Sequence, residues 1–284
     1  MILHAAEKIA YKLPPLVVEA IRTAESMTFG AHGRRRVGPG DSFYQYRQYT
    51  AGESTHRIDW RASARSERTF IRENEWEAAQ TLFFWSDSSP SMQWHSQATP
   101  YSKEERAKLI CLSLAALLLK GHEQIADMDG HMSPSRDPGA LFRLHDSLSQ
   151  APTGNVPPLM DLPRRSHIIA IGDFLMDAEQ MASWIEQASA QGVHLILVEI
   201  ADPHEESFPY KGPQEFEGLE AEDPLKMGNA NAVREAYLSK RQRLRQALQA
   251  SANQAGARYY THLTNDSVKS LLFKLFTHLK AGAR

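Results

Sequence analysis

What this sequence lacks excludes several classes of protein. It has one cysteine, Cys111, so it can form no internal disulfide, which is consistent with a reducing compartment. Its longest apolar run, residues 109–119 with one serine inside it, is too short to span a bilayer, and its N-terminus lacks the apolar core and cleavage site of a signal peptide. The formal net charge is −2, so there is no basic surplus to favour nucleic acid or an anionic membrane. We therefore expect a cytoplasmic soluble protein with no membrane span and no nucleic-acid partner.

A short apolar run at residues 82–85 ends in a group of oxygen-bearing side chains. The run predicts a strand buried on both faces, and Asp87, Ser89 and Ser91 follow it at alternate positions. The crevice beyond the carboxyl ends of parallel strands is where open α/β sheets bind ligands. One carboxylate and two hydroxyls are hard oxygen ligands of the kind that Mg²⁺ prefers, although a plain strand-to-helix turn would look the same in sequence.

Apolar runs and helix signals alternate after this strand, which predicts an α/β protein with a doubly wound, mostly parallel sheet of the Rossmann type. A capping box at Ser102–Glu105 opens the first helix of this series, and Gly192 ends a later one. We predict strands at residues 122–131 (an edge strand), 167–172, 194–200 and 258–261, helices at 102–120, 141–148, 177–191, 232–255 and 267–280, and a loop with a short hairpin at 210–231.

Two groups of charged residues are interpreted as having no binding role. We interpret the basic residues of the long helix at 232–255 as a solvated face, and we expect no metal site at the consecutive residues 204–206. The basic residues are Arg234, Lys240, Arg241, Arg243 and Arg245. His204, Glu205 and Glu206 are consecutive, and adjacent side chains rarely converge on one ion.

The segment before the first buried strand is rich in arginine, carboxylates and aromatic residues. A helix is predicted after Pro14-Pro15, and residues 42–77 then interleave Arg with Asp and Glu in a partly β segment. Arginine forms bidentate bonds with carboxylates, so this segment predicts an ion-pair network that braces irregular backbone, with an anion-binding or catalytic role left open. Its central residues are Arg47, Arg57, Asp59, Trp60, Arg61 and Arg65. We expect Asp59 to be buried and paired with a nearby arginine.

This segment carries a family resemblance. The pattern comprises Gly38-Pro39-Gly40-Asp41, Phe43, Arg47, Tyr49, Gly52-Glu53, Arg57, Ile58-Asp59-Trp60-Arg61, Ala64-Arg65 and Arg72-Glu73. It resembles the signature of the domain of unknown function family 58, and it runs directly into the Asp-x-Ser-x-Ser strand, as in that family. The signature often has Glu at position 41 and Asp at position 53, so both exchanges keep the carboxylate. The resemblance spans roughly residues 30–280 and implies a von Willebrand factor A-like domain at 78–284, preceded by a small N-terminal extension at 1–77 that contains β structure.

The resemblance also implies a metal-ion-dependent adhesion site that binds Mg²⁺ or Mn²⁺. Asp87, Ser89 and Ser91 match the motif, and Asp173, after the strand at 167–172, matches its second carboxylate, although Asp173 could instead cap the following helix. The full site also uses a threonine from a middle loop. The chain has no threonine between Leu119 and Ala151, where only Ser133 or Ser135 could substitute.

The function that this resemblance implies is protein binding without catalysis. The partner would be an AAA+ ATPase of the MoxR family, in the assembly or maturation of other protein complexes, with Met92 and Trp94 as an apolar rim of the binding face. One alternative is a structural interaction domain without metal. Another is a metal-dependent phosphoesterase, which we disfavour because the sequence places no His or Lys beside Asp87.

Overall fold

The computed structural model divides the chain into two compact units. The large unit contains Met1–Gly30 and Gln80–Phe276, and the small unit contains Ala31–Ala79 and Thr277–Arg284. The residues that the structure describes are 14–27, 34–37, 43–50, 53–66, 68–78, 80–150, 155–219 and 224–282.

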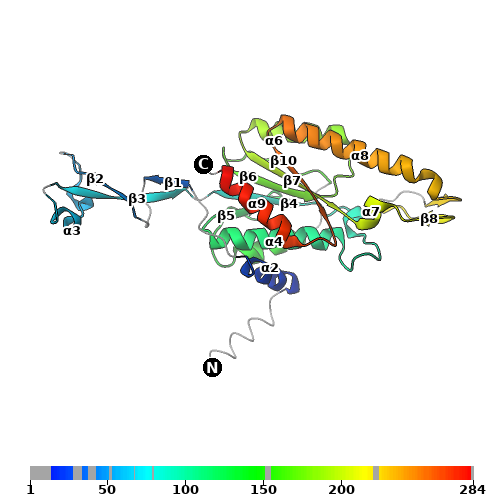
Figure 1. The fold of residues 1–284 in the computed structure, drawn as a ribbon, viewed down its shortest axis with the longest axis horizontal. Helices are drawn as coiled ribbons and strands as arrows, with labels where there is room; N and C mark the ends of the chain where they lie inside the picture. The colour runs from blue at the N-terminus through cyan, green and yellow to red at the C-terminus, as the bar shows by residue number, and fades with distance from the viewer. Residues whose placement is uncertain are drawn as a thin grey trace, which may run out of the picture. The chain divides into compact units, whose positions relative to one another are not determined.

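A five-stranded parallel sheet forms the centre of the large unit (Figure 1). Its strands lie in the order β10–β7–β6–β4–β5, and every neighbouring pair is parallel. Their bounds are β4 Thr81–Ser86, β5 Gln124–Asp127, β6 His167–Gly172, β7 His194–Ala201 and β10 Arg258–Leu263. The predicted strand at 122–131 is confirmed as an edge strand, and the architecture is mixed α/β and compatible with a Rossmann-like fold.

The direction of winding reverses between β4 and β6. The chain leaves β4 for β5 on one side, and β6 then pairs with β4 on the other side and leads to β7. This arrangement is a topological switch point, where the loops after two adjacent parallel strands diverge and leave a crevice. Asp87 follows β4 and Asp173 follows β6, so the sheet brings both predicted carboxylates to this crevice.

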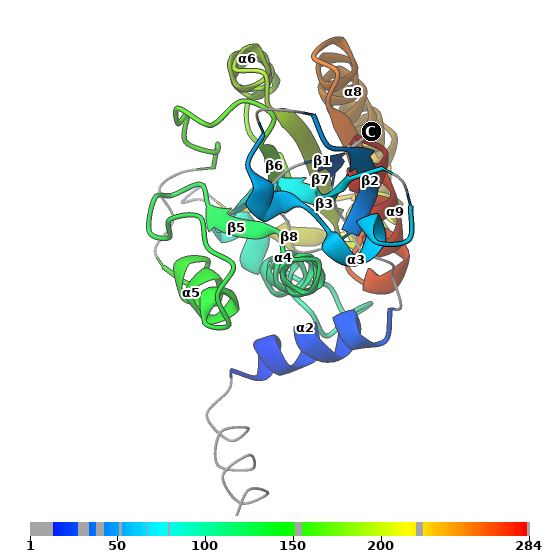
Figure 2. The same cartoon turned by 90° about the vertical axis from the view of Figure 1, so that its left-hand side faces the viewer.

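Helices cover both faces of the sheet (Figure 2). Helix α4 (Lys103–Lys120) lies on one face and begins with the predicted capping box of Ser102 and Glu105. Helices α6 (Ala178–Ala190) and α8 (Asn231–Gln254) lie on the other face, where Phe83 and Trp85 of β4 join Trp184 and Leu248 in the core. Helix α2 (Pro15–Glu25) packs on α4 through its buried face. No described helix is long and apolar enough to cross a membrane.

Shorter elements complete the large unit. They are the 3₁₀ helix η2 (Pro90–Gln93), helices α5 (Ala140–Ser147) and α7 (Pro203–Ser207), and the hairpin of β8 (Gln214–Phe216) and β9 (Leu225–Met227). Helix α9 (Val268–Gly282) belongs to the large unit as far as Phe276. Helix α7 was not predicted: Asp202 caps it, accepting from the backbone N–H of His204, and Glu205 closes a capping box. Met92 is fully buried, so its predicted place in an apolar rim is wrong.

The small unit contains antiparallel β structure. Strand β3 (Phe70–Ala78) pairs with β1 (Arg34–Val37) on one side and with β2 (Phe43–Gln48) on the other. The 3₁₀ helix η1 (Thr55–Arg57) and helix α3 (Trp60–Ser63) lie between β2 and β3 in sequence. The predicted β content of the segment before residue 78 is therefore confirmed.

Candidate metal centre at the switch point of the sheet

The ends of β4 and β6 approach each other too closely for any side chain but hydrogen at position 172. The backbone N–H of Asp87 donates to the carbonyl of Ile171 at 2.8 Å, which fixes the two strand ends together. A Cβ atom on Gly172 would lie 2.8 Å from the Cβ of Asp87, closer than side chains pack. Gly172 thus gives the Asp87 side chain its position beside Asp173.

The carboxylate of Asp87 is buried and only half satisfied. Its side chain accepts a hydrogen bond at Oδ1 from the backbone N–H of Ser89 at 2.8 Å, whereas Oδ2 has no hydrogen-bond partner among the described residues. Burial and then the nearby charge of Asp173 raise the pKa of Asp87 to about 7, against the lowering effects of Ser89 and Lys103. A cation beside Oδ2 would therefore stabilise the ionised form.

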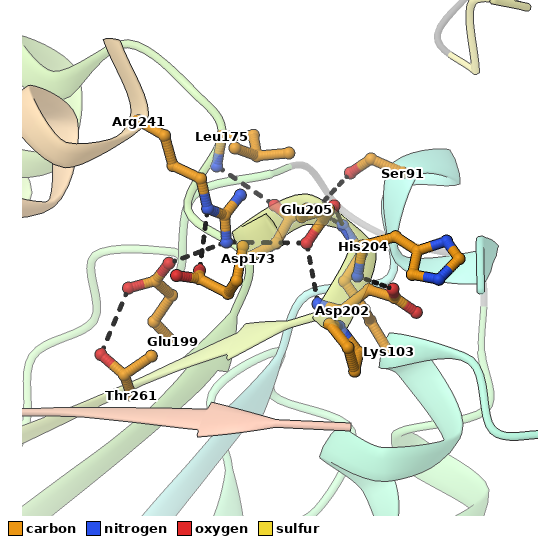
Figure 3. Close-up of polar contacts among 12 residues, drawn as sticks. Ser91, Lys103, Asp173, Leu175, Glu199, Asp202, His204, Glu205, Arg241 and Thr261 are labelled. Atoms are coloured by element: carbon orange, nitrogen blue, oxygen red, sulfur yellow. Dashed lines mark hydrogen bonds and ion pairs between the residues drawn. The ribbon is translucent and has the colours of Figure 1, made fainter. Parts of the chain in front are cut away.

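Ser89 and Ser91 link Asp87 to Asp173, with the backbone N–H of Ser89 bound to Asp87. The hydroxyls of Ser89 and Ser91 lie 3.1 Å apart, and Ser91 Oγ donates to Asp173 Oδ2 at 2.8 Å. The other oxygen of Asp173, Oδ1, accepts from the backbone N–H of Leu175 at 3.1 Å (Figure 3). The structure thus brings together all four predicted site residues, Asp87, Ser89, Ser91 and Asp173.

A buried lysine that the sequence analysis did not identify also lies at this site. Lys103, in the first turn of α4, places Nζ 2.8 Å from Asp173 Oδ2 and 2.7 Å from Glu205 Oε1 (Figure 3). Burial alone would lower the pKa of Lys103, but the two carboxylates raise it above its usual value. The sequence places no lysine beside Asp87, whereas the fold brings Lys103 to the neighbouring Asp173. The side chain of Lys103 is 1% exposed and its ammonium group is already paired twice, so it is not available to a phosphate group.

The basic face predicted on α8 is partly buried, which corrects its interpretation as a solvated face. Arg241 is 8% exposed and forms ion pairs with Glu199 and Glu206, and Arg245 pairs with the same two carboxylates. Arg241 also lies 3.6 Å from Glu205, which connects this cluster to Lys103. We call these seven residues the ion-pair cluster: Lys103, Asp173, Glu199, Glu205, Glu206, Arg241 and Arg245.

A cavity of about 250 Å³ opens at the two aspartates. Its lining includes Asp87, Ser89, Ser91 and Asp173, together with Asn155 and Glu217, which the sequence analysis did not identify. Among the described residues no group of three or more His, Cys, Asp or Glu side chains is placed to hold a metal. The available donors are instead the Asp87 carboxylate, with its unpartnered Oδ2, and two serine hydroxyls, and such an oxygen set suits a hard cation.

The serines considered as substitutes for the missing threonine do not line this cavity. The hydroxyl of Ser135 bonds with Asp137 and Arg143, and Ser133 is exposed. His204 and Glu206 do not line this cavity either, and Glu206 pairs with arginines of α8.

The predicted motif residues of the arginine-rich segment lie in the small unit. Arg47 pairs with Glu53 at 2.6 Å, one of the predicted ion pairs. Asp59 is half-buried, caps α3 by accepting from the N–H of Ala62 at 2.9 Å, and accepts from the hydroxyl of Tyr46 at 3.3 Å. The remaining predicted residues, Trp60, Arg61 and Arg65, are exposed, and the side chain of Arg57 lies outside the described side chains.

Fold and site together define an α/β protein with a parallel sheet and an oxygen-rich crevice at its switch point. The family model described as protein of unknown function DUF58 matches residues 45–135 and 158–247, more than half of the chain. The chain therefore belongs to this family, and that resemblance is confirmed. No curated protein matches this chain.

Two solved structures are similar to this chain in part. One is the conserved hypothetical protein BatB from Bacteroides thetaiotaomicron, 14% identical, covering 71% of this chain and 98% of that chain with a TM-score of 0.40. The other is an aerotolerance-related membrane protein from Bacteroides fragilis, 14% identical, covering 72% and 100% with a TM-score of 0.39.

Proposed function

We propose that this chain is a non-catalytic protein-binding module whose von Willebrand factor A-like domain holds Mg²⁺ or Mn²⁺ at Asp87. The observation that carries the proposal is the buried Oδ2 of Asp87, which has no partner among the described residues, at a residue that lines the same cavity as Ser89 and Ser91. An ionised carboxylate without a partner is costly to bury, and a cation is the group that offsets that cost. When bound, a divalent cation would supply positive charge and an open position for a carboxylate of a partner protein.

The residues of the chain have distinct parts in this proposal. Asp87, Ser89 and Ser91 would hold the ion, with Ser89 N–H orienting the Asp87 carboxylate. Asp173 would orient Ser91 by accepting a hydrogen bond from its hydroxyl group, and it is itself held by Lys103 and by the N–H of Leu175. Asn155 and Glu217 also line this cavity.

The partner that we propose, on the family resemblance of the sequence, is an AAA+ ATPase of the MoxR family, acting with this chain on another protein complex. The exposure of two leucines at the cavity is consistent with a protein partner. Leu175 and Leu219, which line it, are 47% and 44% exposed and offer apolar surface beside the proposed metal site.

A second candidate is a structural interaction domain that binds no metal. It is favoured by Lys103, because its ammonium group already neutralises Asp173 and so reduces the charge that would attract a cation. The two candidates differ in what they require of Asp87, since only the first requires a cation at that carboxylate.

Calorimetric titration of Mg²⁺ and Mn²⁺ into the full chain tests the proposal. We expect saturable binding at millimolar concentrations and a rise in melting temperature, both lost in Asp87→Asn. Asp177→Asn is the matched control, because Asp177 caps α6 and asparagine caps a helix equally well. Absence of binding heat and thermal shift in the wild type would support the metal-free candidate, whereas equal binding by Asp87→Asn would reject Asp87 as the metal ligand.

A further inference from the structure

An aromatic groove adjoins the proposed metal site. It is a cavity of about 550 Å³, within the range of ligand pockets, and it shares Ser91, Leu175, Glu217 and Leu219 with the cavity at Asp87. Six rings line it, and these define the aromatic groove: Trp94, His204, Phe208, Tyr210, Phe216 and Tyr237. A ligand could therefore reach the groove and the Asp87 site at the same time.

The wall of the groove is built around a strained residue. Phe208 has φ 43° and ψ 67°, in the left-handed region that a bulky side chain rarely adopts. Its ring packs against Tyr237 at 4.9 Å, Tyr210 at 5.2 Å and Phe216 at 6.0 Å between centroids. Strain of this kind persists where the surroundings fix the residue, so the rings form a preformed wall.

The charges along the groove are mostly negative. Glu217 is exposed and has no ion pair with another described residue, and Glu215 has a 3.4 Å contact with Lys226 in which both side chains are exposed. The cation in the lining, Lys103, is already paired with Asp173 and Glu205. The groove therefore presents aromatic faces together with uncompensated carboxylate charge.

We propose that the aromatic groove binds an arginine side chain of the partner protein, next to the acidic side chain that binds at Asp87. Guanidinium groups stack on aromatic faces and pair with carboxylates in a planar geometry, so both features of the groove favour them. An apolar side chain would instead remove Glu217 from water with no partner, which is unfavourable. The acidic contact at Asp87 rests on the proposed function, whereas the binding of arginine in the groove does not depend on it.

Binding of N-acetyl-L-argininamide to the full chain, in the presence of a chelator, tests this site alone. The readout is the indole N–H resonance of Trp94 in ¹⁵N-labelled protein, assigned with Trp94→Phe. We expect a saturable shift at millimolar ligand and about tenfold weaker binding of N-acetyl-L-citrullinamide, which has the same shape without the charge. Glu217→Gln should weaken the binding of argininamide several-fold, whereas Glu235→Gln, an exposed residue of α8 outside the groove, should not.

The possible results separate this inference from the proposed function. Argininamide binding without any Mg²⁺ binding by the chain would support the groove and reject the metal site. The inference is overturned if argininamide produces no saturable shift at tens of millimolar, if citrullinamide binds equally well, or if N-acetyl-L-lysinamide binds more tightly. It is also overturned if Glu217→Gln and Glu235→Gln behave alike.

Discussion

At the scale of single residues, Gly172 determines whether the two strand ends can approach. The close approach involves the backbone of β6 and the Cβ of Asp87, and the hydrogen bond between Asp87 N and Ile171 O prevents either strand from moving away alone. Position 172 therefore limits the geometry of the site although it contributes no side-chain atom to it.

Gly172→Ala should destabilise the protein and weaken metal binding together. We expect a loss of about 1–3 kcal/mol in the free energy of unfolding, because the new methyl group overpacks the contact with Asp87. Gly228→Ala is the control, since a Cβ there would meet no heavy atom within 4 Å, and its effect should stay within about 0.5 kcal/mol. Urea unfolding and magnesium titration of the two variants measure both effects, and equal stabilities would show that the strand ends can separate.

His262, in β10, predicts how stability depends on pH. The side chain is 3% exposed, and burial, followed by the nearby Arg106, lowers its pKa from 6.5 to about 4, with Lys274 acting in the same direction and Asp266 in the opposite one. Between these two values the unfolded chain binds more protons than the folded chain, so stability falls as pH falls from about 6.5 to 4.

His262→Gln should remove this component of the acid sensitivity. Between pH 7 and pH 4 the wild type should lose on the order of 3 kcal/mol more stability than the variant. Above pH 7 the histidine is neutral in both states, so the two stability curves should run parallel there. Unfolding by urea at a series of pH values measures the difference, and curves that stay parallel down to pH 4 would contradict the prediction.

At the scale of secondary-structure elements, Lys103 joins α4 to the loops after β6 and β7. Removing one partner of a buried ion pair leaves uncompensated charge and costs about 3–5 kcal/mol. Lys103→Met should therefore be strongly destabilising. Lys108→Met on the same helix removes a partly exposed pair with Glu104 and should cost about 0.5 kcal/mol.

Urea unfolding of these two lysine variants measures whether losing the buried pair lowers the free energy of unfolding more than losing the partly exposed pair. Adding Glu205→Gln to Lys103→Met removes one of the carboxylates that the first change leaves unpaired, so the double variant should lose less than the sum of the single ones. Similar losses for Lys103→Met and Lys108→Met would mean that water reaches Asp173 and Glu205.

The elements themselves follow from local sequence patterns, which is why most of the sheet could be predicted. Strand β6 is a short apolar run, and α4 begins with a capping box whose two partners are three residues apart. The ion-pair cluster could not be derived in this way, because Lys103 and Glu205 are 102 residues apart in sequence.

Two weaker signals were nevertheless present in the sequence. Glu199 is a lone carboxylate in β7, whose other residues after His194 are apolar, and a buried carboxylate requires a cation, which Arg241 and Arg245 supply. Lys103 is a cation in the first turn of a helix, where the helix dipole disfavours positive charge. Each signal indicates an unknown partner without identifying it.

At the scale of the whole molecule, the candidate metal centre and the aromatic groove lie in the large unit, on the loops after β4, β6 and β7. These loops come from the carboxyl edge of one sheet, so they can form one continuous binding surface. A lasting interface buries roughly 1,200–2,000 Å² in total, which exceeds what a single metal contact provides.

Association with a MoxR-type AAA+ ATPase should therefore depend on more than the metal. We expect binding of the wild type in Mg²⁺, a loss of binding in chelator or in Asp87→Ala, and weaker binding for Trp94→Ala, whose ring lines the groove. Sedimentation of the mixed proteins measures these differences. Asp87→Ala binding as well as the wild type, with no effect of chelator, would reject metal-mediated docking.

The close approach at Gly172 also matters for protein engineering. Transplanting Asp87, Ser89, Ser91 and Asp173 onto another parallel sheet would copy the donor atoms but not the room between the strands that carry them. A recipient scaffold would need a glycine at the end of its second strand and a buried ammonium group to hold the second aspartate. The smallest portable form of this site is therefore a pair of adjacent strand ends with their supporting helix, and a motif search by donor residues alone would select scaffolds that cannot accommodate it.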